Sequence, residues 1–287
     1  MPGPPQHAGS RTLYASGLAI RSEVLDRLGV PHGFSTRSGG VSTGIFHTLN
    51  FGNPGDLPPE ERDSRANIAE NLRRVSAAIG AEDRRIMQVH QMHGTDVAVA
   101  DPDAIWADAL RADGIVTDDP RALTGVRVAD CVPLLLSTLD GRVVAAVHAG
   151  WRGVIGGIAS KAVLAARELA ARHGFSTDLA AAIGPRIGVG AFEVGEEVAG
   201  PFESAFGPAT SGPTSVVRRD MGLRPHIDLG AAVARQLAAA GLPADRIDVL
   251  PQCTASEPEL FFSHRRDKAR SGRMIALIGP RAMTDQG

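Results

Sequence analysis

The chain of 287 residues is predicted to adopt an α/β fold with mixed sheets. Short runs of β-favouring residues outnumber the helical segments, and they do not alternate strictly with helices as the strands of a Rossmann fold do. No repeat of solenoid period and no low-complexity linker interrupts the chain after residue 12. We therefore expect a disordered lead-in over residues 1–12 and a single domain over residues 13–287.

The first third of the chain contains one expected strand, one turn-rich loop and one expected helix. The strand covers His32–Thr36, and Ser-Gly-Gly at residues 38–40 marks a loop. Two prolines in a first turn and a periodic apolar pattern predict one helix over residues 58–79, which Gly80 ends.

The middle of the chain is expected to be rich in strands, followed by one long helix. The β-favouring runs are Ile86–Val89, Asp96–Ala100, Gly114–Thr117, Gly125–Val128, Val132–Ser137 and Arg142–Val147. An alanine-rich helix is predicted from Val154 to about His173, where Gly174 ends it.

The last third combines strands with one capped helix. A strand is expected at Leu179–Ile183 and a helix over Leu229–Ala240, with Asp228 as its N-cap. Two further strands are predicted at Ile247–Leu250 and Met274–Ile278.

Composition excludes several classes of protein. A net charge of −2 provides no global basic field, so we expect no nucleic-acid partner. No apolar run approaches the ~20 residues that cross a bilayer, so no membrane association is expected. The two cysteines, Cys131 and Cys253, do not form a disulfide framework, and the N-terminus lacks the pattern of a signal peptide. We expect a cytoplasmic protein.

Three potential metal ligands stand at the ends of expected strands. His93, Cys131 and His148 each lie beside a small or turn-forming residue, where a rigid scaffold can direct side chains into a shared cleft. A catalytic zinc site uses three such protein ligands and keeps one position open. From the pattern alone, a core histidine and a buried cysteine remain the commoner interpretation. The spacing matches no standard metal motif.

Nine short segments in a fixed order point to a known family. Together they resemble the bacterial proteins first described as multicopper polyphenol oxidases, or laccase-domain proteins, and later as purine nucleoside phosphorylases. The resemblance spans roughly residues 30 to 280. The segments are HGFSTRSGGV at 32–41, TLN at 48–50, QMHG at 91–94, ADG at 112–114, ADCVPL at 129–134, VHAGWRG at 147–153, IGP at 183–185, FEVG at 192–195 and FFSHRRD at 261–267.

The resemblance implies a four-layer α/β/β/α sandwich and a zinc ion bound by His93, Cys131 and His148. Copper could occupy the same ligands. The sequence reads QVHQMHG, so His90 also fits the first ligand, but Gly94 follows His93 as the family pattern requires. His90 is then expected either to contact substrate or to lie next to the metal ligands without binding the metal.

The implied activity is phosphorolysis of purine nucleosides: adenosine, inosine and methylthioadenosine, with adenosine deamination as a side activity. The partners are then purine nucleosides and phosphate, and a homodimer is compatible with the resemblance. Forked guanidinium groups and loop N–H donors would hold the phosphate. The expected substrate-binding residues are Arg37, Gly39, Gly40, Asn50, His90, Arg152, His264 and Arg266, with Arg265 as a further basic residue. Each could instead have a structural role.

Two other functions stay open. A copper-dependent, laccase-like polyphenol oxidase would need a blue-copper site and a trinuclear cluster, but the chain has nine histidines and no H-x-H pair. A non-enzymatic, zinc-stapled interaction module would need a fourth protein ligand. Asp113, Asp130 and Asp267 could each orient a metal-bound histidine or make a structural hydrogen bond.

Overall fold

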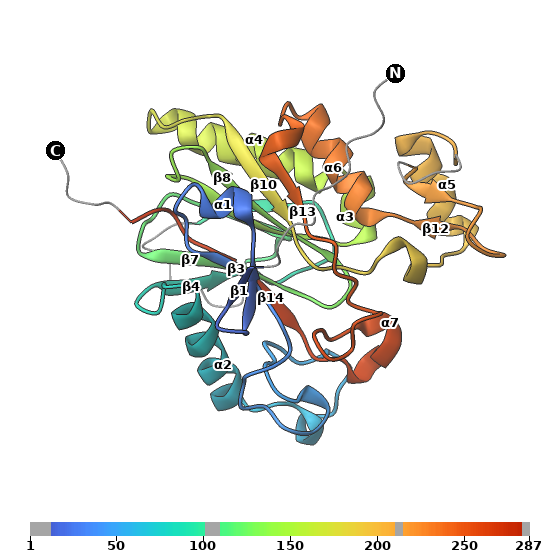
Figure 1. The fold of residues 1–287 in the computed structure, drawn as a ribbon, viewed down its shortest axis with the longest axis horizontal. Coiled ribbons are helices and arrows are strands. Elements are labelled where there is room, and N and C mark those ends of the chain that lie inside the picture. The colour runs from blue at the N-terminus through green and yellow to red at the C-terminus, as the bar shows by residue number, and fades with distance from the viewer. Residues whose placement is uncertain (1–12, 101–109, 210–214, 283–287) are drawn as a thin grey trace.

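Two six-stranded sheets pack face to face at the centre of the molecule (Figure 1). The computed structural model describes residues 13–100, 110–209 and 215–282, and the expected lead-in lies outside them. The strand order is β1-β2-β3-β14-β7-β4 in the first sheet and β13-β10-β8-β9-β6-β5 in the second. Each sheet contains parallel and antiparallel pairs, which confirms the predicted α/β fold with mixed sheets.

The strands of the first sheet are β1 (Leu13–Ala15), β2 (Ala19–Arg21), β3 (His32–Ser35), β4 (Arg85–Gln88), β7 (Ala122–Val128) and β14 (Met274–Ile278). Those of the second sheet are β5 (Val97–Val99), β6 (Gly114–Thr117), β8 (Val132–Thr138), β9 (Val144–Ala149), β10 (Leu179–Ile183) and β13 (Ile247–Val249). A separate hairpin pairs β11 (Val217–Arg218) with β12 (His226–Ile227).

The α-helices are α1 (Glu23–Asp26), α2 (Arg65–Ala78), α3 (Trp151–Ile155), α4 (Ile158–Arg172), α5 (Glu196–Phe206), α6 (Leu229–Ala239) and α7 (His264–Asp267). Short 3₁₀ turns are η1 (Gly44–Phe46), η2 (Pro59–Glu61), η3 (Val189–Ala191), η4 (Ala244–Arg246) and η5 (Lys268–Arg270). None of the helices in the described ranges combines the length and apolar character that crossing a bilayer requires.

Helices cover the outer face of each sheet, as Figure 1 shows for α4 and α6 on one side and α2 on the other. Successive residues of a strand point to opposite faces. Leu134 and Leu136 of β8 accordingly join the core under α4 and α6, whereas Leu135 joins the core between the sheets. Val75 of α2 packs with Leu277 of β14 in a third cluster. The layers thus run helix, sheet, sheet, helix.

Both long predicted helices are interrupted, so their expected bounds were wrong. The pattern over residues 58–79 divides into η2 and α2, because Ser64 forms a new N-cap and its Oγ accepts the Asn67 N–H at 3.0 Å. The pattern over residues 154–173 divides into α3 and α4. Gly157 makes this break with a left-handed φ of 79°, a conformation that glycine adopts without steric cost.

Other elements agree with the sequence where local signals were strong. The strands β6, β10 and β14 have the predicted bounds, and the Asp228 side chain caps α6 by accepting the Ala231 N–H at 2.8 Å. Helix α5 was not predicted, since Pro201 inside it resembles a helix breaker.

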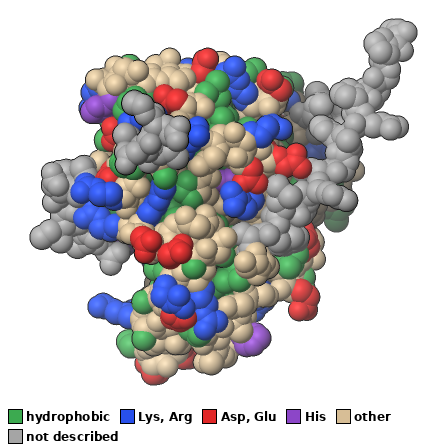
Figure 2. Space-filling view, turned by 60° about the vertical axis from the view of Figure 1, so that its left-hand side comes forward, with side chains coloured by type: hydrophobic (Ala, Val, Ile, Leu, Met, Phe, Trp, Pro, Cys, Tyr) green, Lys and Arg blue, Asp and Glu red, His purple; other side chains and the backbone are tan. Residues whose placement is uncertain are grey.

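Charges of both signs are intermixed on the surface. On the face shown in Figure 2, Lys and Arg side chains lie among Asp and Glu side chains. The described part of this face therefore presents no continuous basic surface of the kind that binds nucleic acid.

Strand pairing brings distant residues to one edge of the second sheet. In the antiparallel pair of β8 and β9, Pro133 faces His148. Cys131, the residue before β8, therefore lies beside the end of β9. The backbone N–H of His148 donates to the carbonyl of Asp113 at 2.7 Å. The loop between β4 and β5, which carries His93, reaches the same place through its bonds to Asp113.

Candidate metal centre and adjoining cavities

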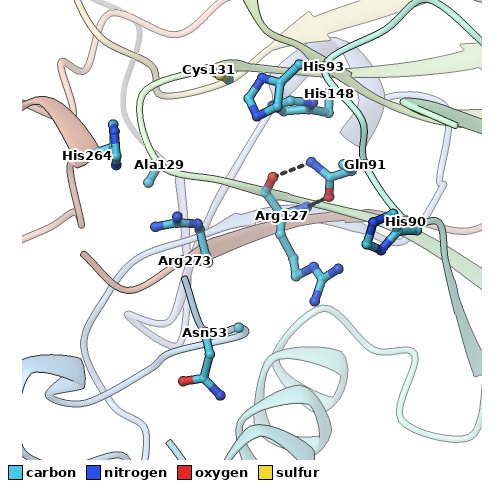
Figure 3. Close-up of a pocket in the computed structure, with 11 residues that line it drawn as sticks. Asn53, His90, Gln91, His93, Arg127, Ala129, Cys131, His148, His264 and Arg273 are labelled. Atoms are coloured by element: carbon cyan, nitrogen blue, oxygen red, sulfur yellow. Dashed lines mark hydrogen bonds between the residues drawn. The ribbon is translucent and has the colours of Figure 1, made fainter. Parts of the chain in front are cut away.

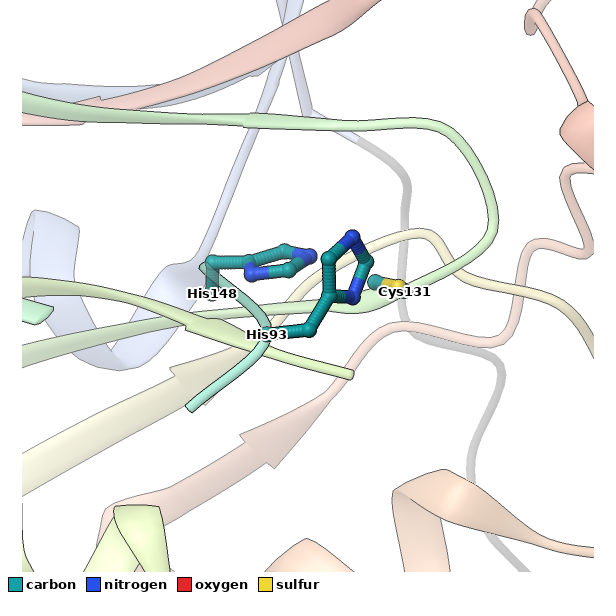
Figure 4. A group of neighbouring side chains, drawn as sticks. All are labelled: His93, Cys131 and His148. Carbon is teal, nitrogen blue, oxygen red and sulfur yellow. The ribbon is translucent and has the colours of Figure 1, made fainter. Parts of the chain in front are cut away.

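Three side chains from three segments meet at this sheet edge (Figure 4). Ligand atoms of His93, Cys131 and His148 all lie within 4.8 Å of one another, and the two imidazole rings meet edge-on with their centroids 4.7 Å apart. No fourth His, Cys, Asp or Glu among the described residues belongs to this group. The group could therefore hold a metal ion and leave a coordination position open.

The backbone around the group is unusual in three places. His93 and Asp130 have left-handed φ values of 58° and 83°, which non-glycine residues rarely adopt. Gly150 leaves room that a side chain would fill. A Cβ there would lie 2.8 Å from Nδ1 of His93 and 3.4 Å from Sγ of Cys131. The close approach of the three ligands thus requires glycine at position 150.

One buried carboxylate holds two of the three candidate ligands. Oδ1 of Asp113 accepts the Nδ1 of His148 at 2.8 Å and the backbone N–H of His93 at 2.9 Å. Its Oδ2 accepts the N–H groups of Met92 at 3.1 Å and Gly94 at 2.7 Å. With Nδ1 bonded in this way, His148 presents Nε2 to the group.

Electrostatics favour an ionised thiol in this group. Burial raises the pKa of Cys131, but the neighbouring His148 and His93 lower it to about 6. Burial lowers the pKa of His148, and the adjacent Cys131 and Asp113 raise it to about 9. Without metal, these pKa values describe a thiolate paired with a protonated His148, so binding a metal ion at this group would release the His148 proton.

A polar cavity of about 300 Å³ opens on one side of the group (Figure 3). Its described lining includes His90, Gln91, Arg127, His264 and Arg273, and it contains no Asp or Glu. Burial lowers the pKa of Arg273, and the like charge of Arg127 acts in the same direction. Two guanidinium groups close together give this cavity positive charge, which favours binding of an anion.

An apolar cavity of about 530 Å³ opens on the other side. Arg152 stacks over Trp151 with its Cζ 4.1 Å from the ring centroid, and Arg265 lies over Phe192 at 5.2 Å. Met92, Ile187 and Leu229 complete its apolar lining. The two cavities share His93, Ala129, Cys131 and His264, so a ligand spanning both would pass the metal-binding group.

Comparison with known proteins places the chain in a family. Residues 31–281 match the family model described as multi-copper polyphenol oxidoreductase laccase. The chain belongs to this family. A purine nucleoside phosphorylase of Deinococcus radiodurans is 36% identical over 252 residues, which cover 88% of this chain and 90% of that protein. The purine nucleoside phosphorylase YlmD of Geobacillus stearothermophilus is 35% identical over 262 residues, covering 88% and 91%.

Solved structures of two members share the fold. The crystal structure of YlmD from Geobacillus stearothermophilus has a TM-score of 0.79 and 31% identity, and the match covers 94% of this chain and 99% of that one. The hypothetical protein YfiH of Bacillus licheniformis has a TM-score of 0.76 and 27% identity, covering 92% and 97%. The α/β fold of this laccase-family member is therefore shared along nearly the whole chain.

The structure separates the two histidines that the sequence left as alternatives. In this laccase-family chain His93 lies in the group with Cys131 and His148, whereas His90 lines the polar cavity. Figure 3 shows the His90 ring well away from the other three. Of the other expected substrate-binding residues, His264 lines both cavities and Arg152 lines the apolar one.

The expected phosphate-binding loop with Arg37, Gly39 and Gly40 lies outside the lining of both cavities. The Arg37 guanidinium donates to the carbonyl groups of His47 and Pro258 and lies 4.5 Å from the Phe262 ring centroid. The N–H of Gly40 donates to Thr48 Oγ1. These hydrogen bonds hold the loop against neighbouring segments of the chain.

Asn50 and Arg266 also lie outside the lining of both cavities, as does Gly39 of this loop. Gly39 has a left-handed φ of 91° and its carbonyl accepts a hydrogen bond from Arg74. Buried Asn50 donates to Asp63 and accepts the N–H of Arg273 at 2.8 Å. The Arg266 guanidinium donates to three backbone carbonyls and to Asp267. These residues hold loops in place.

Sequence reasoning did not select Arg127, Arg273 or Phe192. Arg127 lies in β7 and Arg273 directly precedes β14, and the antiparallel pairing of these strands brings the two together. No local motif marks either arginine. Phe192 belongs to the FEVG segment that contributed to the family resemblance, but nothing in that segment indicated that its ring lines a cavity.

Proposed function

We propose that the protein is a zinc-dependent purine nucleoside phosphorylase, with residues 13–287 as its catalytic domain. Adenosine, inosine and methylthioadenosine are the proposed substrates. The observation that carries the proposal is the meeting of an arginine-lined polar cavity and an aromatic-lined apolar cavity at His93, Cys131 and His148. The relatives named purine nucleoside phosphorylase support the same activity. A cytoplasmic location would keep the Cys131 thiol reduced.

The donor set fits a catalytic zinc. It offers one thiolate and two imidazoles, and Asp113 already bonds the second ring nitrogen of His148, as carboxylates commonly do for zinc-bound histidines. Zinc held by these three residues would act as a Lewis acid beside the substrate. The same ligands also suit copper.

Arg127 and Arg273 are the proposed phosphate ligands. Phosphorolysis forms a bond from a phosphate oxygen to C1′ of the ribose, while the C1′–N9 bond breaks and its electron pair leaves with the purine. The departing base takes up a proton. Guanidinium groups would hold the phosphate beside a ribose carbon that becomes cationic. Because His264 lines both cavities, we assign it to hydrogen-bond the ribose or the departing base.

The apolar cavity is the proposed purine site. Trp151 and Phe192, each with an arginine over one ring face, contribute aromatic surface for the base, and Ile187 and Leu229 exclude water. Its volume of about 530 Å³ lies within the usual range for small-molecule sites.

The test is release of hypoxanthine from inosine with and without phosphate. We expect release to depend on phosphate and to yield ribose 1-phosphate. The Cys131→Ala variant should lose zinc and turnover, whereas Cys253→Ala is the matched thiol control and should keep both. Free ribose formed at an equal rate without phosphate would show a nucleosidase instead.

Adenosine deamination is proposed as a side activity at the same group. Zinc deaminases that act on bases use a comparable His/Cys ligand set. Adenosine supplied with phosphate should therefore give both adenine and inosine, and both products should disappear in Cys131→Ala. Deamination that persists in this variant would assign it to a contaminating enzyme.

The second candidate is a copper-dependent polyphenol oxidase, which the description of the family model favours. The protein loaded with copper or with zinc should be compared for metal content, phenol oxidation and nucleoside cleavage. Phenol oxidation that needs copper, without nucleoside cleavage by either form, would favour the oxidase.

A further inference from the structure

The carboxylate of Asp130 joins the segment of Cys131 to a distant part of the chain. Asp130 is 8% exposed. Its Oδ1 accepts the hydroxyl of Thr254 at 2.6 Å. Its Oδ2 accepts the backbone N–H of Arg265 at 2.6 Å and the hydroxyl of Ser263 at 3.1 Å. Three donors thus converge on a side chain that directly precedes a candidate metal ligand.

The backbone of Asp130 makes a further connection. Its carbonyl accepts the N–H of Ile187, which lines the apolar cavity, at 3.0 Å. Its φ of 83° lies in the left-handed region, which costs free energy for a residue with a side chain. The surrounding hydrogen bonds must offset that cost, so the position of Asp130 is well determined.

Asp130 lines the apolar cavity, and so does Arg265, one of its three donors. We define the α7 wall as His264, Arg265 and Phe192, all of which line this cavity. The Arg265 guanidinium donates to the carbonyl of Glu193 at 2.8 Å and lies over the Phe192 ring. The Arg265 side chain therefore contacts Phe192, and the Arg265 backbone is hydrogen-bonded to Asp130.

We propose that Asp130 is a positioning residue that sets the spacing between Cys131 and the α7 wall. It thereby controls how tightly a nucleoside is held beside the metal-binding group. The inference rests on the proposed function. Asp113 bonds His93 and His148, whereas the Asp130 carboxylate accepts its hydrogen bonds from Thr254, Ser263 and Arg265. The two carboxylates therefore have different roles: Asp113 orients the candidate metal ligands, and Asp130 positions the α7 wall.

The experiment compares Asp130→Asn, Thr254→Val and Thr254→Ser with the wild-type protein. Thr254→Val removes one donor to Asp130 at a buried position without altering Asp130 or Cys131, and Thr254→Ser keeps the hydroxyl. Metal content after dialysis is measured first. KM for inosine, KM for phosphate and kcat are then determined for each metal-loaded protein.

We expect Asp130→Asn to raise KM for inosine by about tenfold, the effect of weakening hydrogen bonds to a buried charge. Thr254→Val should raise it by about threefold and Thr254→Ser by less than about twofold, because the serine hydroxyl still donates. Metal content and KM for phosphate should stay at wild-type values, since the three candidate metal ligands and the proposed phosphate ligands Arg127 and Arg273 lie outside the α7 wall. Asp113→Asn should show the opposite pattern and lose metal.

Several outcomes would overturn the inference. One is an unchanged KM for inosine in both Asp130→Asn and Thr254→Val, with an active wild-type protein. Another is loss of metal from Asp130→Asn to the extent seen in Asp113→Asn. A lower melting temperature and lower kcat at unchanged KM would show a purely structural role. A wild-type protein without phosphate-dependent cleavage would instead refute the proposed function, and the inference with it.

Discussion

Replacing Asp113 by asparagine should weaken metal binding, because this carboxylate bonds two of the three candidate ligands. The carboxylate, 1% exposed, accepts four hydrogen bonds, two on each oxygen. An asparagine keeps one oxygen, so its amide group must face two N–H donors in either orientation. If the amide replaces Oδ1, it opposes Nδ1 of His148 and the N–H of His93. If it replaces Oδ2, it opposes Met92 and Gly94.

The magnitude follows from the number of bonds lost. Each hydrogen bond to a charged group contributes roughly 1.5–3 kcal/mol, so two lost bonds cost about 3–6 kcal/mol in total. Part of this loss already destabilises the metal-free protein. The part specific to the metal-bound state should lower zinc affinity about 10- to 100-fold, as for other carboxylates that bond a metal-bound histidine.

The assay is competition for zinc between the protein and a chromogenic chelator. The matched control is Asp119→Asn, which removes another nearly buried carboxylate that bonds Arg121 away from the group. We expect wild-type zinc affinity for this control and reduced affinity for Asp113→Asn. Wild-type affinity in a folded Asp113→Asn protein would refute the argument that this carboxylate orients the ligands.

Three further predictions concern the same region. Gly150→Ala should reduce zinc retention in the chelator assay, because the new Cβ would lie 2.8 Å from Nδ1 of His93. The control Gly200→Ala, in open space on α5, should retain zinc like the wild-type protein. Equal zinc retention in the two variants would contradict the packing argument. Arg273→Ala should raise KM for phosphate about tenfold or more by removing a charged contact, while Arg37→Ala should change it less than about twofold. The reverse order would restore the glycine-rich loop as the phosphate site. His90→Ala should keep its zinc by metal analysis, since this ring lies outside the ligand group; loss of zinc would make it a ligand.

Local sequence signals determined those elements whose cause is local. Strands β6 and β14 are bounded by turn-forming residues, and Asp228 satisfies the first turn of α6 through its own side chain. The helix breaks at Ser64 and Gly157 were missed because periodicity continues across them. A hydrophobic pattern reports which face is buried, and it does not report where the backbone changes direction.

The candidate metal ligands could be named from the sequence because family motifs carry Cys131 and His148 in recognisable blocks. The separation of His93 from His90 needed the three-dimensional arrangement, since both fit the motif and only one reaches the other ligands. Arg127 likewise has no local signal, because its place in the polar cavity follows from strand pairing.

The roles of the two buried aspartates show most directly what tertiary structure decides. The sequence analysis treated Asp113 and Asp130 as equivalent candidates to orient a histidine. The fold directs Asp113 to His148 and Asp130 to Thr254 and Arg265. A carboxylate takes its role from the donors that surround it, and here those donors come from segments far away in the chain. The sequence alone therefore determined the residue types and much of the strand pattern. Packing of distant segments decided which carboxylate bonds a candidate metal ligand and which bonds Thr254 and Arg265.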